Sequence, residues 1–400
     1  MAIRSGLNLQ PGQELVIQAQ LEAVPLVRRV TEHAYRAGAS LVTTLLVDEQ
    51  AALIRLRHGS DAGMNAAAGW LLDGLATAHE RNAAALSITL GDPSLLAGQD
   101  PARVGRVSRA QSAAGKRRLD LITQFRVNWL VLPAASPGWA RAVFPGVAEA
   151  EAVARLWDAI FAASRIDGAD PLADWAAHYG RLAGWAARLN GRRYASLHFR
   201  GPGTDLRVGL ADGHLWKGGA GVARNGVTCN PNIPTEEVFT TPHRDRVDGH
   251  VTSSKPLALR GSLVDGIAMR FEAGRAVEVS AREGGEVLAR LLDTDEGARR
   301  LGEVALVPDS SPIARSGLLF RNTLFDENAA CHIAMGSAYT ECLVGAASLG
   351  PDEARGRGAN DSLIHVDWMI GSGEMDVDGV DADGQAEPVM RRGEWAWEAG

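Results

Sequence analysis

The protein has 400 residues, of which 46% are hydrophobic and 22% charged, a composition typical of globular proteins with an ordinary hydrophobic core. Its formal net charge of −7 argues against a nucleic-acid-binding surface, because contacts with phosphates need clustered Lys and Arg. A chain of this length exceeds what one core usually serves, so we expect two domains.

The N-terminal segment, MAIRSGLNLQPGQEL, lacks the continuous apolar core of a signal peptide. The sequence also contains no run of 18 uninterrupted apolar residues, so no membrane span and no membrane partner are expected. Cys229, Cys331 and Cys342 match neither a CxxC motif nor a disulfide framework. These features predict a cytoplasmic protein with reduced thiols.

Strand and helix signals alternate along the first half of the chain. Residues 14–19 are predicted as a strand, residues 24–37 have helical spacing, and residues 41–47 form the next predicted strand. Such a strand–helix–strand unit favours a parallel sheet with a right-handed crossover. Further predicted elements are a long Ala-rich helix over 62–85, strands at 86–90 and 127–132, and mainly helix over 148–189. We therefore predict an N-terminal α/β domain over residues 1–190.

After Asn190 the pattern changes to short strands separated by Gly-rich and Pro-rich turns. The predicted strands are residues 195–199, 204–210, 247–253 and 266–271, in an antiparallel or mixed sheet, with helices at 285–292 and 328–339. The acidic segment DVDGVDADG is predicted as a hairpin turn, because it lacks the spacing and terminal Glu of a calcium loop. The predicted fold class is thus α/β plus α+β, with a C-terminal mixed-sheet catalytic domain over residues 191–400.

Near the C-terminus, the apolar segment SLIHVDWMIG carries His365 and Asp367. Residues two apart on a strand point to the same side, so the imidazole and the carboxylate emerge together from an apolar wall. Burying a polar group without a partner costs roughly 2–7 kcal/mol, and a charge costs more. The pair therefore needs a salt bridge, a hydrogen-bond network or a metal ion.

Three other segments carry side chains able to bind metal. Glu236 and Glu237 are adjacent in NPNIPTEEVFTTP and point to opposite sides if the segment is extended. Glu303 leads the apolar run GEVALVP, which is predicted as a buried strand. His332 and Tyr339 are seven positions apart, so they share a face of the helix predicted there.

Taken singly, each of these residues also has a structural explanation. A Glu of the adjacent pair can be surface charge, His332 a hydrogen-bonded core histidine, and Tyr339 an ordinary core residue. Glu303 can pair with Arg299 or Arg300, and the two groups of the HVD motif can simply bond each other. Considered one at a time, these residues therefore do not distinguish a structural role from a functional one.

Taken together, the residues form a coherent set of ligands. Three carboxylates and two imidazoles are too many for one closed tetrahedral zinc site, which has four ligands. They suit two metal ions ~3.5–4 Å apart with a bridging carboxylate. Oxygen and nitrogen ligands without thiolate fit Zn²⁺, Co²⁺ or Mn²⁺, and Mg²⁺ is a further candidate. Such a pair lowers the pKa of a shared water, which is chemistry suited to hydrolysis.

The segments NIPTEEVFTTP, DENAACHIAMGSAY and SLIHVDWMIGS resemble motifs of the aminopeptidase T family of dinuclear metallo-aminopeptidases. The segments GLNLQPGQELVIQA, AYRAGAS, GTDLRVGL and LLDTDEGARRLGEVALVP are similar to that family as well, so the resemblance spans nearly the whole chain. It implies a two-domain, homodimeric exopeptidase that removes N-terminal residues from peptides with a free N-terminus. The metal ligands that it implies are Glu237, Glu303, His332, His365 and Asp367.

The resemblance also implies catalytic roles. Tyr339 matches a catalytic tyrosine, which could hydrogen-bond the tetrahedral oxyanion. With Glu237 as the ligand of the adjacent pair, Glu236 is a candidate general base for the metal-bound water, and Glu303 could share that task. Cys331, which directly precedes His332, and the Ala-rich N-terminal helix depart from the family pattern but lie outside the implied chemistry.

Two alternatives compete with this interpretation. A dinuclear hydrolase of another class, acting on phosphoesters or other amides, would keep the metals; such sites often use HxH or DxH patterns, and the first half contains none. A non-enzymatic ligand-binding α/β protein is the second alternative. Against it, neither a Walker A run nor a G-x-G-x-x-G motif follows the first predicted strand.

Overall fold

The computed structural model describes residues 1–93, 95–96, 98–259, 262–346 and 348–398. They form two compact units: Met1–Trp175 with Ala220–Pro234, and Ala176–Gly219 with Thr235–Gly400. The boundary expected after residue 190 lies inside helix α8, Pro171–Arg192. The change of pattern at Asn190 therefore marks the end of this helix, and the later segment 220–234 returns to the first unit. The assignment of catalysis to the second domain stays a prediction.

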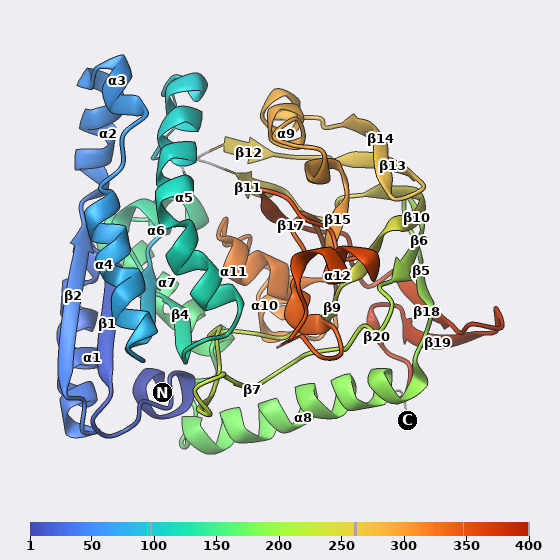
Figure 1. Ribbon diagram of the computed structural model, residues 1–400, viewed down its shortest axis with the longest axis horizontal. Helices are drawn as coiled ribbons and strands as arrows, with labels where there is room; N and C mark the ends of the chain where they lie inside the picture. Colours follow the sequence, from blue (N-terminus) through green and yellow to red (C-terminus); the bar gives the residue numbers. More distant parts are fainter. Residues whose placement is uncertain (94, 97, 260–261, 347, 399–400) are drawn as a thin grey trace. The chain divides into compact units, whose positions relative to one another are not determined.

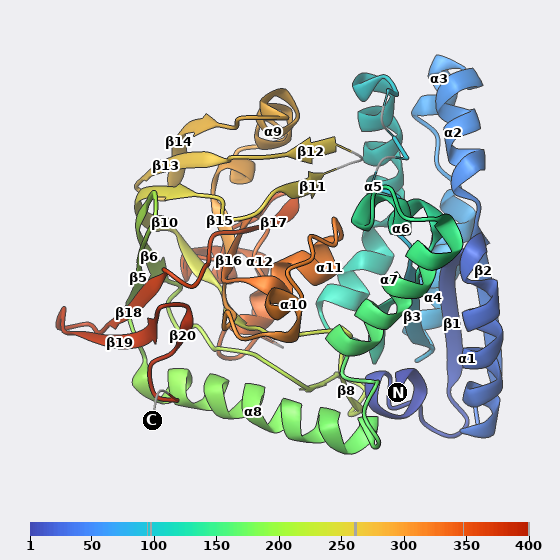
Figure 2. The same cartoon turned by 180° about the vertical axis from the view of Figure 1, so that it is seen from behind.

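The first unit is built on a four-stranded sheet in the order β2-β1-β3-β4. All three strand pairs are parallel, which confirms the predicted parallel sheet. Helices α4 and α5 lie on one face of this sheet, and α6 and α7 lie on the other (Figures 1 and 2). The strands are β1 Glu14–Gln20, β2 Leu41–Val47, β3 Ala84–Thr89 and β4 Trp129–Pro133, with the short pair β7 Gly221–Val222 and β8 Thr228–Cys229.

The helices of the first unit follow the amphipathic pattern of the sequence. In α1 the buried residues Val27, Val30 and Ala34 form one stripe, as the helical spacing predicts. The helical stretch predicted around 62–85 contains α3 and most of its remaining length is α4, but its last two residues pair as the start of β3 between β1 and β4, because sheet pairing overrides alanine's helix propensity. The helices are α1 Val24–Arg36, α2 Glu49–His58, α3 Asp61–Met64, α4 Gly69–Glu80, α5 Pro101–Thr123, α6 Pro137–Val143 and α7 Glu149–Ala163, with η1 Ala2–Gly6 and η2 Leu21–Ala23.

The second unit contains two larger antiparallel sheets that share one hydrophobic core. Leu197 and Val247 from one sheet are in the same buried cluster as Val304 and Ile333 from the other, together with Leu182 of α8. The eight-stranded sheet has the order β14-β13-β10-β6-β5-β18-β19-β20, and the four-stranded sheet has the order β17-β16-β15-β9. This arrangement confirms the predicted change to antiparallel strands, and the pairing of β18 with β19 confirms a hairpin at the acidic segment.

The strands of the second unit are β5 Ser196–Gly201, β6 Thr204–Leu210, β9 Val238–Thr240, β10 Pro242–Thr252, β11 Leu257–Leu259, β12 Ser262–Val264, β13 Ala268–Glu272, β14 Arg275–Ser280, β15 Leu301–Leu306, β16 His332–Gly336, β17 His365–Met369, β18 Asp376–Val380, β19 Ala386–Arg391 and β20 Glu394–Trp395. Its helices after α8 are α9 Gly285–Leu292, α10 Pro312–Arg315, α11 Thr323–Asp326 and α12 Pro351–Gly356, with the short turns η3 Gly297–Arg299, η4 Glu327–Ala329 and η5 Thr340–Cys342. Helix α9 confirms the helix predicted at 285–292.

The helix predicted over residues 328–339 is wrong. Residues His332–Gly336 form strand β16, which pairs on one side with β15 and on the other with β17. All five residues are buried, so pairing on both edges outweighs the helical preference of the local Ala-rich sequence. His332 and Tyr339 therefore do not share a helix face, and Tyr339 lies in the chain after the strand. Among the described residues, no helix has both the length and the apolar composition to span a membrane.

Candidate metal centre

Neighbouring strands of the four-stranded sheet carry four of the five predicted ligands. In the observed register, Glu303 of β15 and Asp367 of β17 both pair with Ala334 of β16. His332 is two residues from Ala334, and His365 is two residues from Asp367. Because side chains alternate along a strand, all four ligands lie on one face of the sheet. The strands lie side by side in Figure 2.

The fifth predicted ligand, Glu237, directly precedes strand β9, which pairs with β15. Its Oε2 atom lies 3.0 Å from Nε2 of His332, and both side chains are buried. Glu237, Glu303 and His332 form one group whose potential ligand atoms all lie within 4.8 Å of one another.

Glu303, His365 and Asp367 form a second group of the same kind. Nε2 of His365 lies 3.2 Å from Oε2 of Glu303 and 3.5 Å from Oδ1 of Asp367. The other oxygen of Glu303, Oε1, lies 3.9 Å from Nε2 of His332. Glu303 is thus common to both groups and presents one carboxylate oxygen to each.

Backbone carbonyls orient both imidazoles. Nδ1 of His365 lies 2.7 Å from the carbonyl oxygen of Ser337, and Nδ1 of His332 lies 3.2 Å from that of Ala330. A carbonyl oxygen can only accept a hydrogen bond, so each Nδ1 carries a proton. Nε2 is therefore the atom that offers a lone pair when the ring is neutral.

Burial and mutual repulsion disturb the protonation of this cluster. Burial raises the pKa of Glu303 to about 7, although nearby His365 opposes the rise, and the charges of Asp367 and Glu237 add to it. Burial alone would lower the pKa of His332, but its contact with Glu237 and the charges of Asp367 and Glu303 raise it to about 10. The acidic surroundings thus favour positive charge on the imidazole.

The donor atoms of these residues fit divalent metal ions. Nε2 of His365 and Oδ1 of Asp367 are buried and have no hydrogen-bond partner among the described residues, since their close contacts have ion-pair distances but not hydrogen-bond geometry. Ligands bound at about 2.0–2.1 Å around one tetrahedral ion are ~3.3 Å apart, close to the spacings found here. Carboxylate and imidazole ligands without thiolate are typical of Zn²⁺, Co²⁺ and Mn²⁺.

Tyr339 borders the centre. Its ring packs edge-on against His365 at 4.7 Å and against Phe239 at 5.8 Å between ring centroids. Burial and then the charge of Glu303 raise the pKa of Tyr339 well above its ordinary value. The phenol therefore stays protonated and can donate a hydrogen bond.

Glu236 has different surroundings from its neighbour Glu237. Its carboxylate lies 3.8 Å from Nε2 of buried His178 in α8, and its backbone N–H donates to Oδ1 of Asn328. Neither group of ligand atoms among the described residues includes it. Alternation along an extended segment explains why adjacent glutamates differ in this way.

Glu327 is a carboxylate of this centre that the sequence analysis missed. Burial, followed by the charges of Asp367 and Glu237, raises the pKa of Glu327 well above its ordinary value, so its side chain lies within electrostatic range of the ligands. The feature of the sequence that could have indicated Glu327 is the acidic pair Asp326-Glu327, which stands shortly before His332. The predicted helix over 328–339 obscured that signal, because it placed Glu327 outside the element carrying the ligand.

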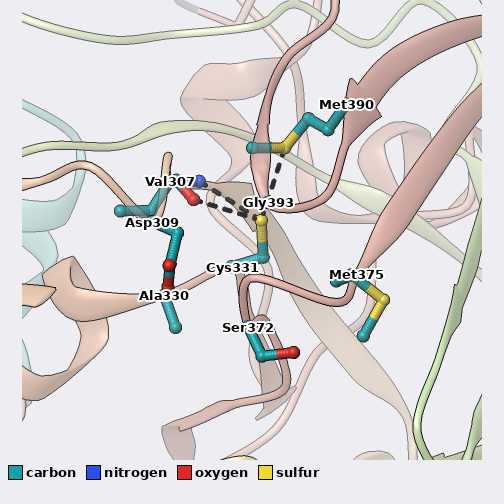
Figure 3. Close-up of a pocket in the computed structure, with 8 residues that line it drawn as sticks. All are labelled: Val307, Asp309, Ala330, Cys331, Ser372, Met375, Met390 and Gly393. Carbon is teal, nitrogen blue, oxygen red and sulfur yellow. Dashed lines mark hydrogen bonds between the residues drawn. The ribbon is translucent and has the colours of Figure 1, made fainter.

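Cys331 lies behind the centre and lines a small pocket with Met390 and Met375 (Figure 3). Its Sγ lies 3.4 Å from both the amide nitrogen and the carbonyl oxygen of Val307. Burial raises the pKa of the Cys331 thiol to about 12. The residue therefore fills the side of β16 opposite His332 and remains a neutral thiol.

Comparisons with known proteins identify the family of this chain. The family model described as thermophilic metalloprotease (M29) matches residues 1–395. Aminopeptidase T of Thermus thermophilus is 57% identical over 395 residues, covering 99% of this chain and 96% of that protein. Aminopeptidase 2 of Geobacillus stearothermophilus is 45% identical over 398 residues, covering 100% and 96%. The solved structure of wild-type AmpT from Thermus thermophilus superposes with a TM-score of 0.93 at 56% identity, covering 99% and 97%. With a family model matched over nearly its whole length, the chain belongs to the M29 family of thermophilic metalloproteases.

Proposed function

We infer that the protein is a metal-dependent aminopeptidase, and we propose that it releases N-terminal residues from peptides at a centre of two divalent ions. The observation that carries the dinuclear assignment is that two groups of ligands share Glu303. A carboxylate common to two sites is the usual bridge between ions ~3.5–4 Å apart. Family membership supports the class of reaction, and the position of Glu303 supports the number of ions.

In this proposal Glu237, Glu303 and His332 would hold one ion, and Glu303, His365 and Asp367 would hold the other. Zn²⁺, Co²⁺ and Mn²⁺ suit these ligands, and Mg²⁺ is a further candidate. Bound divalent ions would lower the pKa of water toward ~7 and polarise the scissile carbonyl group.

The surrounding side chains would perform the proton transfers. The Tyr339 hydroxyl, protonated at neutral pH, would donate a hydrogen bond to the developing oxyanion. Glu236 and Glu303 are candidates for the general base, and we add Glu327. Because both oxygens of Glu303 face imidazoles and Glu236 lies beside His178, we favour Glu327 as the carboxylate that accepts the proton and passes it to the leaving amine.

Activity on three substrates tests the reaction class. We expect hydrolysis of leucyl-p-nitroanilide, loss of activity after chelation, and recovery when Zn²⁺, Co²⁺ or Mn²⁺ is added back. N-acetyl-leucyl-p-nitroanilide should resist hydrolysis, because its amino group is blocked. Preferential cleavage of p-nitrophenyl phosphate would instead support the phosphoesterase alternative.

We also propose that the protein is a homodimer joined at strand β2. This strand forms an edge of the parallel sheet, and Leu41, Leu46 and Val47 are 48%, 39% and 46% exposed. An open edge with apolar side chains is suited to pairing with the same edge of a second copy. We expect Leu46→Lys to shift the mass measured by light scattering toward the monomer. Leu119→Lys, at an exposed leucine of α5, is the matched control. A wild-type protein that is monomeric at micromolar concentration contradicts the proposal.

A cytoplasmic location is a further proposal. Its support is that Cys229, Cys331 and Cys342 are buried thiols outside any disulfide, as in proteins kept in a reducing compartment. Fractionation of the source cells, followed by activity measurement in each fraction, tests it. Activity confined to the medium or the cell envelope would contradict it.

A further inference from the structure

Asn360 connects three chain segments next to the candidate metal centre. It lies between α12 and β17 and is 2% exposed. Its side-chain nitrogen, Nδ2, donates to the carbonyl oxygens of Gly297 at 2.8 Å and Gly336 at 2.6 Å. Its own backbone carbonyl accepts a hydrogen bond from the N–H of Ala338 at 2.9 Å. Asn360 therefore holds the turn that follows β16 at both ends.

The orientation of the Asn360 amide follows from its partners. Both groups facing Nδ2 are carbonyl oxygens, which can only accept, so the NH₂ group and not the oxygen must lie there. Oδ1 has no hydrogen-bond partner among the described residues. The side chain thus acts only as a donor, and an aspartate of the same shape would place an oxygen against two other oxygens.

The turn held by Asn360 leads to two residues of the centre. The carbonyl oxygen of Ser337, between the two anchored residues, accepts the hydrogen bond from Nδ1 of His365. Tyr339 directly follows Ala338, and its ring packs on His365. A shift of this turn would therefore change the hydrogen bond that keeps the proton of His365 on Nδ1. It would also move the Tyr339 hydroxyl.

The backbone around this turn is packed too tightly to absorb a shift. A Cβ atom at Gly336 would lie 2.1 Å from the carbonyl oxygen of Ile364, and Gly336 has a φ of +107°. A Cβ atom at Gly302, next to Glu303, would lie 2.2 Å from the carbonyl oxygen of Ser337. At both glycines the backbone of one segment packs directly against the backbone of the other, with no room for a side chain between them. A movement of the turn would therefore also move β15 and the start of β17.

We propose that Asn360 is a positioning residue that aligns His365 and Tyr339 by anchoring the Gly336–Ala338 turn, an inference that rests on the proposed metal-dependent function. The Asn360 side chain donates to the carbonyl oxygens of Gly297 and Gly336, so in this proposal it acts on the centre through the turn that carries the Ser337 carbonyl. Groups that orient a ligand imidazole typically contribute 10–100-fold to metal affinity or activity.

The variants Asn360→Asp and Asn360→Ala test this role against a purely structural one. Asn360→Asp keeps the shape of the side chain but replaces the donor NH₂ group with an oxygen that repels the two carbonyl oxygens. Asn360→Ala removes the donor without introducing that repulsion. We expect the affinity of the apoprotein for Zn²⁺, measured by competition with a chromophoric chelator, to fall ~10–100-fold. At saturating Zn²⁺, kcat should stay reduced with little change in KM, because Tyr339 follows the same turn.

Asn128→Asp in the first unit is the matched control. Asn128 is also fully buried and donates to the carbonyl oxygen of Leu7, so its replacement should lower the melting temperature while leaving Zn²⁺ affinity and kcat unchanged. Asn360 variants that lose thermal stability like the control but keep wild-type Zn²⁺ affinity and kcat overturn the inference. Wild-type apoprotein that binds no Zn²⁺ would instead refute the proposed function, so the two failures are distinct.

Discussion

Oε2 of Glu303 lies 3.2 Å from Nε2 of His365, while its other oxygen, Oε1, faces His332. This arrangement puts one carboxylate between two imidazoles that come from different strands. A carboxylate in that position is a member of both groups of potential ligands. The consequences for metal binding, catalysis and stability can be measured separately.

Metal removal should inactivate and destabilise the protein together. Without cations, the carboxylates of Glu237, Glu303, Glu327 and Asp367 repel one another. A ligand that binds only the folded state stabilises it by about 2.7 kcal/mol at 100 times its Kd. We expect chelation to abolish peptidase activity and lower the melting temperature, and metal addition to restore both. Scanning calorimetry with parallel activity assays checks this. An unchanged melting temperature after verified metal removal contradicts it.

Glu303→Gln should lose more metal than Glu237→Gln. If Glu303 is the bridge, its loss weakens both sites, whereas loss of Glu237 weakens one. We expect metal analysis after desalting to show nearly metal-free protein for the first variant and about half occupancy for the second. Glu286→Gln, at an exposed position of α9, is the control. Equal metal loss in both glutamate variants would remove the bridging role.

Glu327→Gln should lower kcat by about 10²–10⁴-fold while retaining metal, because a glutamine side chain cannot accept the proton of the attacking water. Glu236→Gln should have a smaller effect, since that carboxylate lies beside His178. Steady-state kinetics on leucyl-p-nitroanilide with metal analysis of each sample checks the order. The reverse order would return the role of general base to Glu236.

Tyr339→Phe should remove one hydrogen-bond donor from the transition state without disturbing the fold. The phenylalanine ring keeps the packing against Phe239 and His365. We expect kcat to fall by ~10²–10³-fold with KM and metal content nearly unchanged. A variant with wild-type kcat would show that the hydroxyl does not contact the oxyanion.

Asp326 should make stability decrease with rising pH. Burial raises the pKa of Asp326 from 3.8 to about 7, even though the N–H groups of Phe320 and Asn322 donate to its carboxylate. As pH rises, the unfolded chain loses the Asp326 proton at a lower pH than the folded protein does. The contribution of Asp326 to the free energy of unfolding is therefore complete below pH 4 and is lost as pH rises to about 7. The loss amounts to at most about 1.4 kcal/mol per pH unit.

This contribution can be measured by urea unfolding from pH 5 to 8 of metal-free wild-type protein and metal-free Asp326→Asn. It equals the difference between their free energies of unfolding. The difference between the two free energies of unfolding should change between pH 5 and 7 and level off above. A difference independent of pH would show that Asp326 titrates normally.

Much of the fold could be predicted from local patterns. The strand at 204–210 and the helix at 285–292 have the predicted bounds, because alternation and helical spacing are properties of consecutive residues. The same reasoning placed His365 and Asp367 on one side of a strand, where the structure also has them. Residue types and short spacings likewise suggested metal ligands and the family.

Other features depend on contacts between distant segments. The chain around His332 looks helical by itself, but it becomes a strand because β15 and β17 pair with both of its edges. The roles proposed for Glu327 and Asn360 depend on neighbours that are distant in the sequence.

The sequence by itself therefore determined the types of ligand and the parallel first sheet, since these follow from residue types and short-range order, and its motifs indicated the class of reaction through their resemblance to a known family. Only the tertiary structure decided which carboxylate lies between the two imidazoles and which side chains orient them. The physical reason is that strand register, set by pairing and burial across the whole second unit, fixes these distances.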